Sequence, residues 1–200
     1  GDTHRSASLT HYHRFSDQLA FSAGGYYEGS NGFFRNDLTG KKADAMESGG
    51  GRMRALWLPT EKLKLDLTVG YDYSDEGAYP YYYQGKITNN RESSYRRGLF
   101  NAGLNLEYCA ENWQFNAITG YQHISDRMFM DQDFIADDIY TLEQRQRIST
   151  FTEEITLKNR TSGRWQWVSG ASFMYQALHT TGPVIFYEEG LRWLENNVNR

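Results

Sequence analysis

The chain has 200 residues, of which 16% are aromatic and 39% hydrophobic, and its formal net charge is −4 at pH 7. No apolar run approaches the roughly 18 residues that a membrane-spanning helix needs, so a helical membrane protein is excluded. The charge gives no indication of nucleic-acid binding, and a single cysteine, Cys109, excludes an internal disulfide.

Several segments alternate apolar and polar residues, as strands with one apolar and one wet face do. In chain order they are residues 19–27, 63–73, 100–108, 113–122, 151–157 and 165–176. The clearest is Leu63–Tyr73. The weakest is Phe151–Leu157, because Glu153 shares a face with Ile155. With the stretches that pair with them, these segments predict about eight antiparallel strands.

Short polar turns separate these strands at regular intervals, and each turn has an aromatic residue beside it. The turns are Ser16-Asp17, Pro59–Lys62, Cys109–Asn112 and Thr161–Arg164, and the aromatic residues are Phe15, Trp57, Trp113 and Trp165. Tyrosines lie near the other ends of the strands, at Tyr27, Tyr73, Tyr121 and Tyr175. Aromatic side chains collect at both headgroup levels of membrane β-barrels, so these residues are predicted to form two membrane-interface girdles.

Long connections alternate with the short turns. They cover about Gly29–Glu47, Glu76–Ser93 and Asp126–Arg145, and a fourth begins near His179. Repeated loops of this length are uncommon in compact soluble domains. They are usual in outer-membrane barrels, which have short periplasmic turns and long extracellular loops. The sequence therefore predicts an all-β, antiparallel transmembrane β-barrel segment of four hairpins.

Several of these strands also carry a family pattern. The stretch GRMRALWLPTEKLKLDLTVGYDY (51–73) resembles the strand, aromatic, Pro-Thr turn, strand hairpin of TonB-dependent outer-membrane receptors. Further matches are FNAITGYQ (115–122), FTEEITLKN (151–159) and RWQWVSGASFMYQ (164–176). The resemblance runs from about Ser6 to Gln176.

The resemblance implies a barrel of about 22 strands, of which this chain would be an internal part. Residues 1–200 show no recognisable plug domain, no TonB-binding box and no barrel-closing strand, and the chain is expected to end inside a loop. The missing partners would be the plug, the other barrel strands and outer-membrane lipid. TonB would act through the absent N-terminal region.

The implied function is energy-coupled uptake of a scarce nutrient across the outer membrane of a Gram-negative cell. The expected cargo is a ferric siderophore or another iron complex, held by the extracellular loops. The implied role includes no bond chemistry, so no catalytic residue and no resident cofactor are expected.

Two loops carry candidate ligand-binding side chains. The β4–β5 region contributes Tyr79, Tyr81, Tyr82, Tyr83 and Arg91, and the first long loop contributes Phe33, Phe34 and Arg35. Aromatic rings and guanidinium groups suit flat, anionic ligands through stacking and cation–π contact. The alternative is that these side chains only pack their own loops.

Other patterns have plainer interpretations. Asp131, Asp133, Asp137 and Asp138 lack the glycine and final glutamate of a calcium loop, so a solvated acidic loop is expected. His11 and His13 share a strand face, but no other ligand type is near them in sequence, so no metal site is predicted. Adjacent strand residues point to opposite faces, so Glu153 and Glu154 cannot flank one bond.

Two other classes of protein remain open. One is a complete eight-stranded outer-membrane barrel with a structural, adhesive or enzymatic role, which requires its last strand to close on the first. The other is a soluble β-barrel ligand carrier, which would bury the apolar strand faces in its own core.

Overall fold

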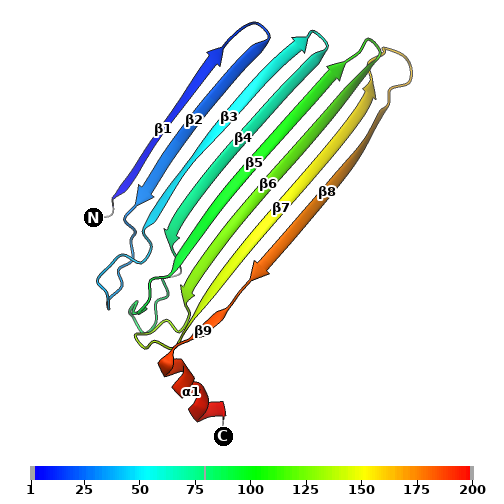
Figure 1. The fold of residues 1–200 in the computed structure, drawn as a ribbon. Coiled ribbons are helices and arrows are strands. Elements are labelled where there is room, and N and C mark those ends of the chain that lie inside the picture. Colours follow the sequence, from blue (N-terminus) through cyan, green and yellow to red (C-terminus); the bar gives the residue numbers. More distant parts are fainter. Residues whose placement is uncertain (1–2, 79, 199–200) are drawn as a thin grey trace.

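The structure is a computed structural model and describes residues 3–78 and 80–198. Within these residues the chain forms one antiparallel sheet whose eight long strands follow each other in chain order (Figure 1). The long strands are β1 (His4–Arg14), β2 (Leu19–Ser30), β3 (Met46–Thr60), β4 (Leu63–Gly77), β5 (Ser94–Cys109), β6 (Trp113–Asp131), β7 (Tyr140–Asn159) and β8 (Val168–Thr181). The predicted all-β fold with antiparallel hairpins is confirmed.

Tight connections join the strands at one end of the sheet, as predicted. Residues 15–18, 61–62 and 110–112 make three of them, and residues 160–167 make a longer fourth one. The prediction that Pro59 lies in a turn is wrong, because it belongs to β3. Pro59 lies where the β3–β4 register shifts between Trp57 and Thr60, a position at which a missing N–H interrupts no ladder bond.

The long loops lie at the opposite end. Residues 31–45 connect β2 to β3, and residues 78–93 connect β4 to β5. The third predicted loop, Asp126–Arg145, is too long, because only residues 132–139 separate β6 from β7. These two strands continue to pair beyond the region with apolar alternation, as far as Asp131 and Thr141.

The fourth predicted loop, beginning near His179, is also wrong. β8 continues to Thr181, and the short strand β9 (Val184–Phe186) then pairs with the beginning of β7. The helix α1 (Glu188–Val198) follows, where a loop-like end was expected. Its first turn contains Glu188 and Glu189, whose charge suits a helix N-terminus. No helix in the described ranges has both the length and the apolar character needed to cross a membrane.

The register gives the sheet one apolar and one polar face. An apolar row crosses seven strands through paired residues, and its members are Leu19, Trp57, Leu65, Leu106, Ala117, Ile155 and Ala171. On the other face Arg54 forms an ion pair with Asp66, with Nε 2.7 Å from Oδ1. Successive residues of a strand point to opposite faces, so this separation follows from the alternation in the sequence.

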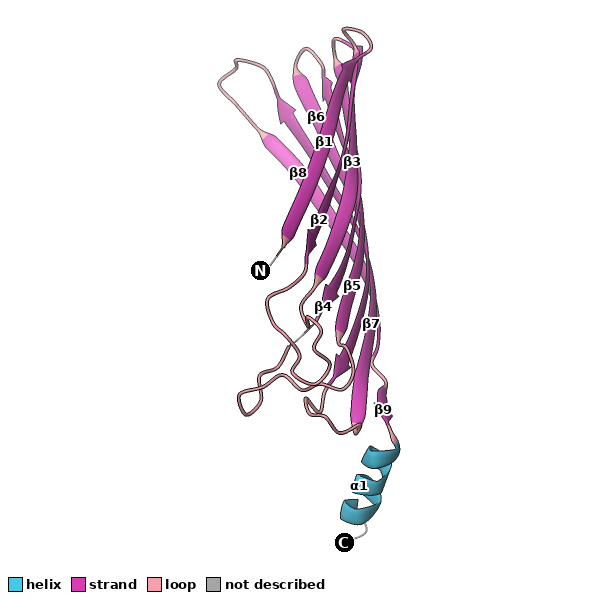
Figure 2. Ribbon diagram, turned by 90° about the vertical axis from the view of Figure 1, so that its left-hand side faces the viewer, coloured by secondary structure: helices cyan, strands magenta, loops and turns pink. Residues whose placement is uncertain are grey.

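The sheet is curved. In Figure 2 the edge strands β1 and β8 lie on the same side of β3, β5 and β7, so the sheet forms a trough. The long loops lie on the side toward which the trough curves. Cavities along the strands are lined by residues of the polar face, among them Thr10, Ser22 and Arg54, which identifies that face as the concave one.

The apolar face has no protein layer against it. Among the described residues the buried hydrophobic side chains are Ala78 and Ile87, and both belong to a loop. On the sheet Leu67 is 44% exposed and Phe173 is 59% exposed. A soluble carrier requires a packed core, which this arrangement does not contain.

The described sheet is open. β1 pairs only with β2, and β8 pairs only with β7, so neither edge strand is joined to the other. A complete eight-stranded barrel requires the first and last strands to pair, and this arrangement does not fit that alternative. Open edges leave backbone groups unpaired, which lipid does not tolerate, so further strands are needed on both sides.

Candidate ligand-binding site

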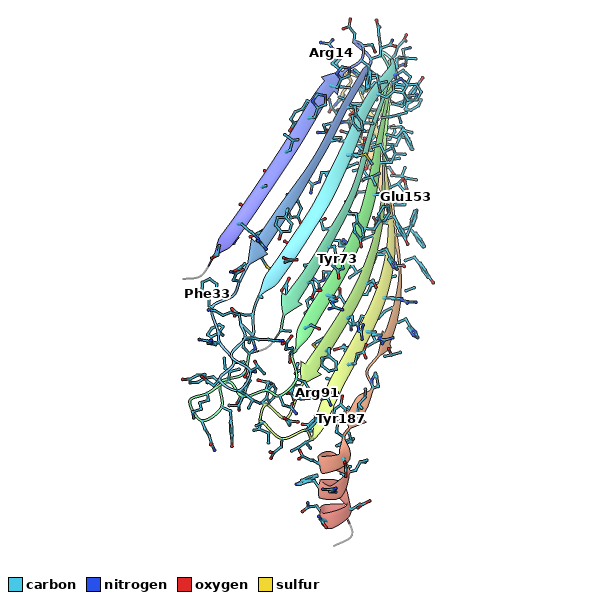
Figure 3. The ribbon with its side chains drawn as sticks, turned by 60° about the vertical axis from the view of Figure 1, so that its left-hand side comes forward. Arg14, Phe33, Tyr73, Arg91, Glu153 and Tyr187 are labelled. Carbon is cyan, nitrogen blue, oxygen red and sulfur yellow. The ribbon has the colours of Figure 1, made fainter. Side chains whose placement is uncertain are left out.

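The candidate site is built from the connections between the strands at one end of the sheet. Figure 3 shows Phe33 and Arg91 at this end and Arg14 at the other end, beside a short turn. Loops 31–45, 78–93 and 132–139 all come from this end. The predicted binding residues of the two long loops therefore belong to the same end of the molecule.

In the first loop, one carboxylate fixes the aromatic pair. Asp44 accepts hydrogen bonds from the backbone N–H of Phe33, 2.8 Å from Oδ2, and of Phe34, 2.8 Å from Oδ1. With their backbone held, the two rings remain more than half exposed. Arg35 donates from Nε to the carbonyl oxygen of Gly40 at 2.9 Å, so this guanidinium is engaged within its own loop.

The two long loops are hydrogen-bonded to each other. The side-chain amide of Asn36 donates to the carbonyl oxygen of Asn89 at 2.7 Å, and both residues are buried. The backbone N–H of Asp37 donates to the carbonyl oxygen of Ile87 at 2.7 Å. Ile87 donates in return to Oδ2 of Asp37 at 3.2 Å. These bonds connect positions about 50 residues apart and make the two loops one structural unit.

The tyrosines of the second loop lie around a two-residue hairpin. Tyr83 and Lys86 exchange backbone hydrogen bonds of 2.9 and 3.0 Å. Gln84 and Gly85 between them have φ values of 47° and 83°, the left-handed conformation that type I′ turns require. The side chain of Tyr82 is 68% exposed. Tyr79 lies outside the described residues.

The other tyrosine of this group contacts the third loop. The ring centroids of Tyr81 and Phe134 are 4.6 Å apart. The aromatic surface of loop 78–93 therefore continues onto loop 132–139.

Arg91 has a different neighbour from the one the sequence suggests. Its guanidinium forms a two-point ion pair with Asp138 and lies over the ring of Tyr187, 3.7 Å from the centroid. The hydrogen bond from Arg91 holds the pKa of the Asp138 carboxyl below its usual range, and raises the pKa of the guanidinium. The structure therefore places the cation of this loop beside Tyr187 and brings Tyr81 to Phe134.

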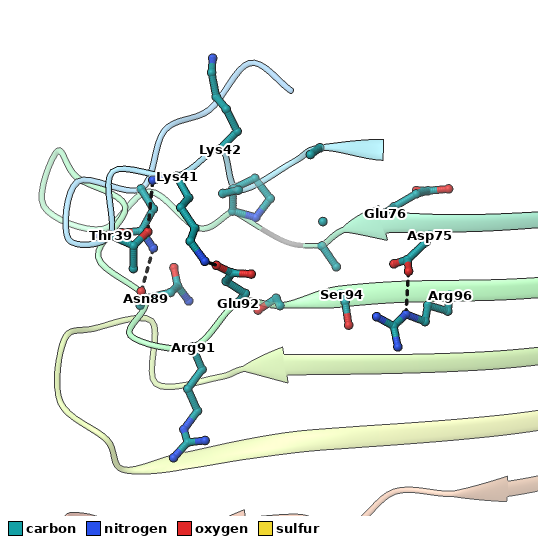
Figure 4. A pocket seen from close by; sticks show the side chains of 17 residues that line it. Thr39, Lys41, Lys42, Asp75, Glu76, Asn89, Arg91, Glu92, Ser94 and Arg96 are labelled. Atoms are coloured by element: carbon teal, nitrogen blue, oxygen red, sulfur yellow. Dashed lines mark hydrogen bonds and ion pairs between the residues drawn. The ribbon is translucent and has the colours of Figure 1, made fainter. Parts of the chain in front are cut away.

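A cavity of about 300 Å³ lies between the two long loops and the ends of β4 and β5 (Figure 4). Its charged lining residues are Lys41, Lys42, Arg91 and Arg96 and the acidic residues Asp75, Glu76 and Glu92. Lys41 forms an ion pair with Glu92, and Asp75 forms one with Arg96 at 2.9 Å. The lining is polar and carries both signs of charge, which suits a ligand that presents oxygen atoms.

Asp131 is a buried carboxyl group below the loops. Its Oδ2 accepts a hydrogen bond from the backbone N–H of Arg91 at 3.0 Å, and the residue is fully buried. Burial, together with the nearby carboxylate of Asp133, raises its pKa to about 6. In the parts of the chain that the structure describes, no three His, Cys, Asp or Glu side chains converge on a metal position.

The aromatic residues at the turns lie as follows. Trp57 and Trp113 are 48% and 40% exposed, close to the tight turns, and Phe15 is also exposed. Trp165 lies in the turn between β7 and β8 and is 82% exposed. Trp167 continues the row of Trp113 instead, because its carbonyl oxygen accepts the N–H of Asn159.

The tyrosines lie at a constant distance along the strands from the turn end. Tyr121 follows Trp113 by eight residues, and Tyr175 follows Trp167 by eight residues. Tyr27 and Tyr73 are joined in one row through Gly49. Eight residues span ~27 Å along a strand, or ~20 Å across a membrane at the usual tilt, close to the apolar band of a barrel.

Sequence reasoning does not identify three members of the site. Asp138 and Tyr187 surround Arg91, and Lys41 lines the cavity. These residues are 40 or more positions from the groups they meet, except for neighbours within a loop. No local pattern relates residues at such separations.

Comparisons with known proteins were made by sequence and by structure. No family model matches the chain, and no curated protein matches it. Among solved structures it is similar to the ferric yersiniabactin uptake receptor FyuA from Yersinia pestis, with a TM-score of 0.74 and 15% identity. The match covers 92% of this chain and 31% of the receptor. The chain has the fold of a TonB-dependent receptor barrel segment.

A second solved structure is the outer membrane transporter YddB from Escherichia coli, at 8% identity and a TM-score of 0.47. It covers 92% of this chain and 32% of that one. The chain thus spans about a third of the length of these proteins. The resemblance stated from the strand patterns is confirmed for the fold of this barrel segment.

Proposed function

We propose that this chain is part of an outer-membrane receptor that takes up a scarce nutrient by energy-coupled transport, with no catalytic step. The observation that carries the proposal is the match of nearly the whole chain to the barrel of an uptake receptor, at a TM-score of 0.74. The exposed apolar face supports it, because lipid would cover what no protein layer covers. The remaining strands, a plug domain and TonB complete the proposed assembly.

The proposed cargo is a ferric siderophore or another anionic iron complex. The exposed rings of Phe33, Phe34 and Tyr82 offer flat apolar surfaces at the loop end of the sheet. Lys41 and Arg91 line the cavity beneath the loops. Aromatic and cationic groups together suit a ligand that combines flat rings with negative charge.

The test is uptake of a radiolabelled ferric siderophore by cells whose only receptor is the full-length protein. We expect accumulation that stops when TonB is deleted. The triple substitution Tyr81→Ala, Tyr82→Ala, Tyr83→Ala should reduce ligand affinity about tenfold or more, since each ring contact contributes about 0.5–1.5 kcal/mol.

Trp165→Ala is the matched control, because this exposed aromatic residue lies at the opposite end of the sheet. It should leave uptake unchanged. Uptake that continues without TonB would show a passive pore and contradict energy coupling. Equal ligand affinity in the triple variant and the wild type would remove the tyrosines from the site.

A further inference from the structure

A row of arginine residues crosses the apolar face of the sheet near its loop end. The register places Arg96 of β5 opposite Arg127 of β6, and Arg127 opposite Arg145 of β7. Residues two apart on a strand share a face, so Arg127 lies on the side of Tyr121, and Arg145 lies on the side of Phe151. Three guanidinium groups are therefore neighbours on the face that carries the predicted girdle.

The carboxylates on this row do not balance the arginines. Asp75 contacts Arg96 at 2.9 Å, and Glu143 contacts both Arg127 at 2.7 Å and Arg145 at 2.5 Å. Two carboxylates thus serve three guanidinium groups. Like charges directly opposite each other destabilise a strand pair. A further anion over the row would relieve this repulsion.

A fourth arginine adds to the excess. Arg147 lies on the same face of β7, opposite His179 of β8, and is exposed. Within residues 3–78 and 80–198 it forms no ion pair. The positive charge is consequently concentrated over β6 and β7. At the other edge of this face, Arg5 is paired with Glu47 at 3.2 Å.

The height of these residues matches the headgroup layer. Arg147 lies four residues beyond Phe151, which is in one row with Tyr121 and Tyr175. Four residues correspond to ~13 Å along a tilted strand, or ~10 Å beyond the ring of tyrosines. Arginine side chains extend their charged ends along the interface, so the guanidinium groups reach the polar layer of the bilayer.

We propose that Arg127, Arg145 and Arg147 form a docking surface for the phosphate groups of a phosphorylated lipid in the outer leaflet. Guanidinium groups bind phosphate with two parallel hydrogen bonds, and a lipid headgroup presents phosphate at this height. The inference rests on the membrane location in the proposed function, but it concerns the outside of the barrel. It requires nothing of the transported ligand.

The test uses the full-length protein in nanodiscs of phosphatidylcholine, into which diphosphorylated lipid A is titrated. Binding is followed by native mass spectrometry and by the rise in Tm. We expect Arg147→Gln to weaken binding about fivefold, and the double substitution Arg127→Gln, Arg145→Gln to weaken it about tenfold or more. Dephosphorylated lipid A and free inorganic phosphate should give no rise in Tm.

Arg52→Gln is the matched control, since Arg52 is exposed on the concave face. It removes one positive charge and should leave lipid binding unchanged. Equal binding by wild type and Arg147→Gln would overturn the proposal, as would equal binding of dephosphorylated lipid A. Uptake measured in the same variants separates the two proposals. Normal uptake with lost lipid selectivity supports the docking surface, whereas failure of the wild type to enter nanodiscs would overturn both.

Discussion

Arg91 and Asp138 form a two-point ion pair between loops 78–93 and 132–139, with Nε 2.7 Å from Oδ1 and the second nitrogen 2.8 Å from Oδ2. Tyr187, which precedes α1, lies against the same guanidinium. Three segments that are far apart in the sequence therefore meet at one arginine. This contact orders the rim of the candidate site.

Breaking this contact should loosen both loops. Both side chains are 37% exposed, so solvent weakens the pair, and we expect a coupling energy of about 1 kcal/mol. The measurement is a double-mutant cycle of Arg91→Gln and Asp138→Asn, read from hydrogen exchange of the loop amides. The pair Arg14 and Asp17 in the short turn is the control, with no effect expected on those loops. Additive effects at Arg91 and Asp138 would contradict the prediction.

The stability of the loops should depend on pH through Asp131. Its pKa is raised from 3.8 to about 6, so the folded state holds the proton more tightly than the unfolded chain. Stability therefore falls as pH rises from about 4 to 6 and stays lower above that range, by about 1–3 kcal/mol. Asp138 acts with the opposite sign, because its lowered pKa gives stability that is lost as pH falls below about 4.

Protection factors of the loop amides at pH 4.5 and 7.5 measure this dependence. Asp131→Asn keeps an acceptor for the N–H of Arg91 and cannot ionise, so it should remove the slope. Asp17→Asn, in an exposed turn, should leave the slope intact. The same slope in Asp131→Asn and the wild type would assign the pH dependence to another group.

Gly77 at the end of β4 is required by the first loop. A Cβ atom there would overlap the carbonyl oxygen of Ala43, which is backbone and cannot rotate away. Gly77→Ala should destabilise the loop end by about 1–3 kcal/mol. Gly103→Ala is the control, because the nearest atom to its Cβ would be 3.9 Å away. Thermal unfolding in detergent compares the two, and equal Tm values would contradict the prediction.

Glu153 is a carboxylate on the apolar face of the sheet. Thr119 donates a hydrogen bond to it at 2.7 Å, and Phe173 lies opposite on β8. Glu153→Leu should stabilise the protein in bilayers by about 1 kcal/mol, since a charged group facing lipid is unfavourable. Glu154→Leu changes the neighbouring residue on the concave face and should give no gain. Urea unfolding in lipid vesicles distinguishes them, and an equal or greater gain in Glu154→Leu would assign the faces the other way.

The sequence predicts the strands well where a bilayer imposes a pattern. Leu63–Tyr73 alternates because one face meets an apolar phase and the other meets water, and β4 occupies this segment. Where β6 and β7 extend beyond the apolar band, both faces are wet. The alternation ends at about Asp126 although the ladder continues to Asp131, and the predicted loop is therefore too long.

Sequence by itself determined the alternation, the tight turns and the aromatic residues beside them, because each depends on neighbours within a few positions. Only the tertiary structure decided that Arg91 meets Tyr187, and that Arg127 lies between Arg96 and Arg145. These contacts depend on strand register and on how distant loops fold together. Neither is encoded in a local period, so the pairing of the sheet had to place these side chains.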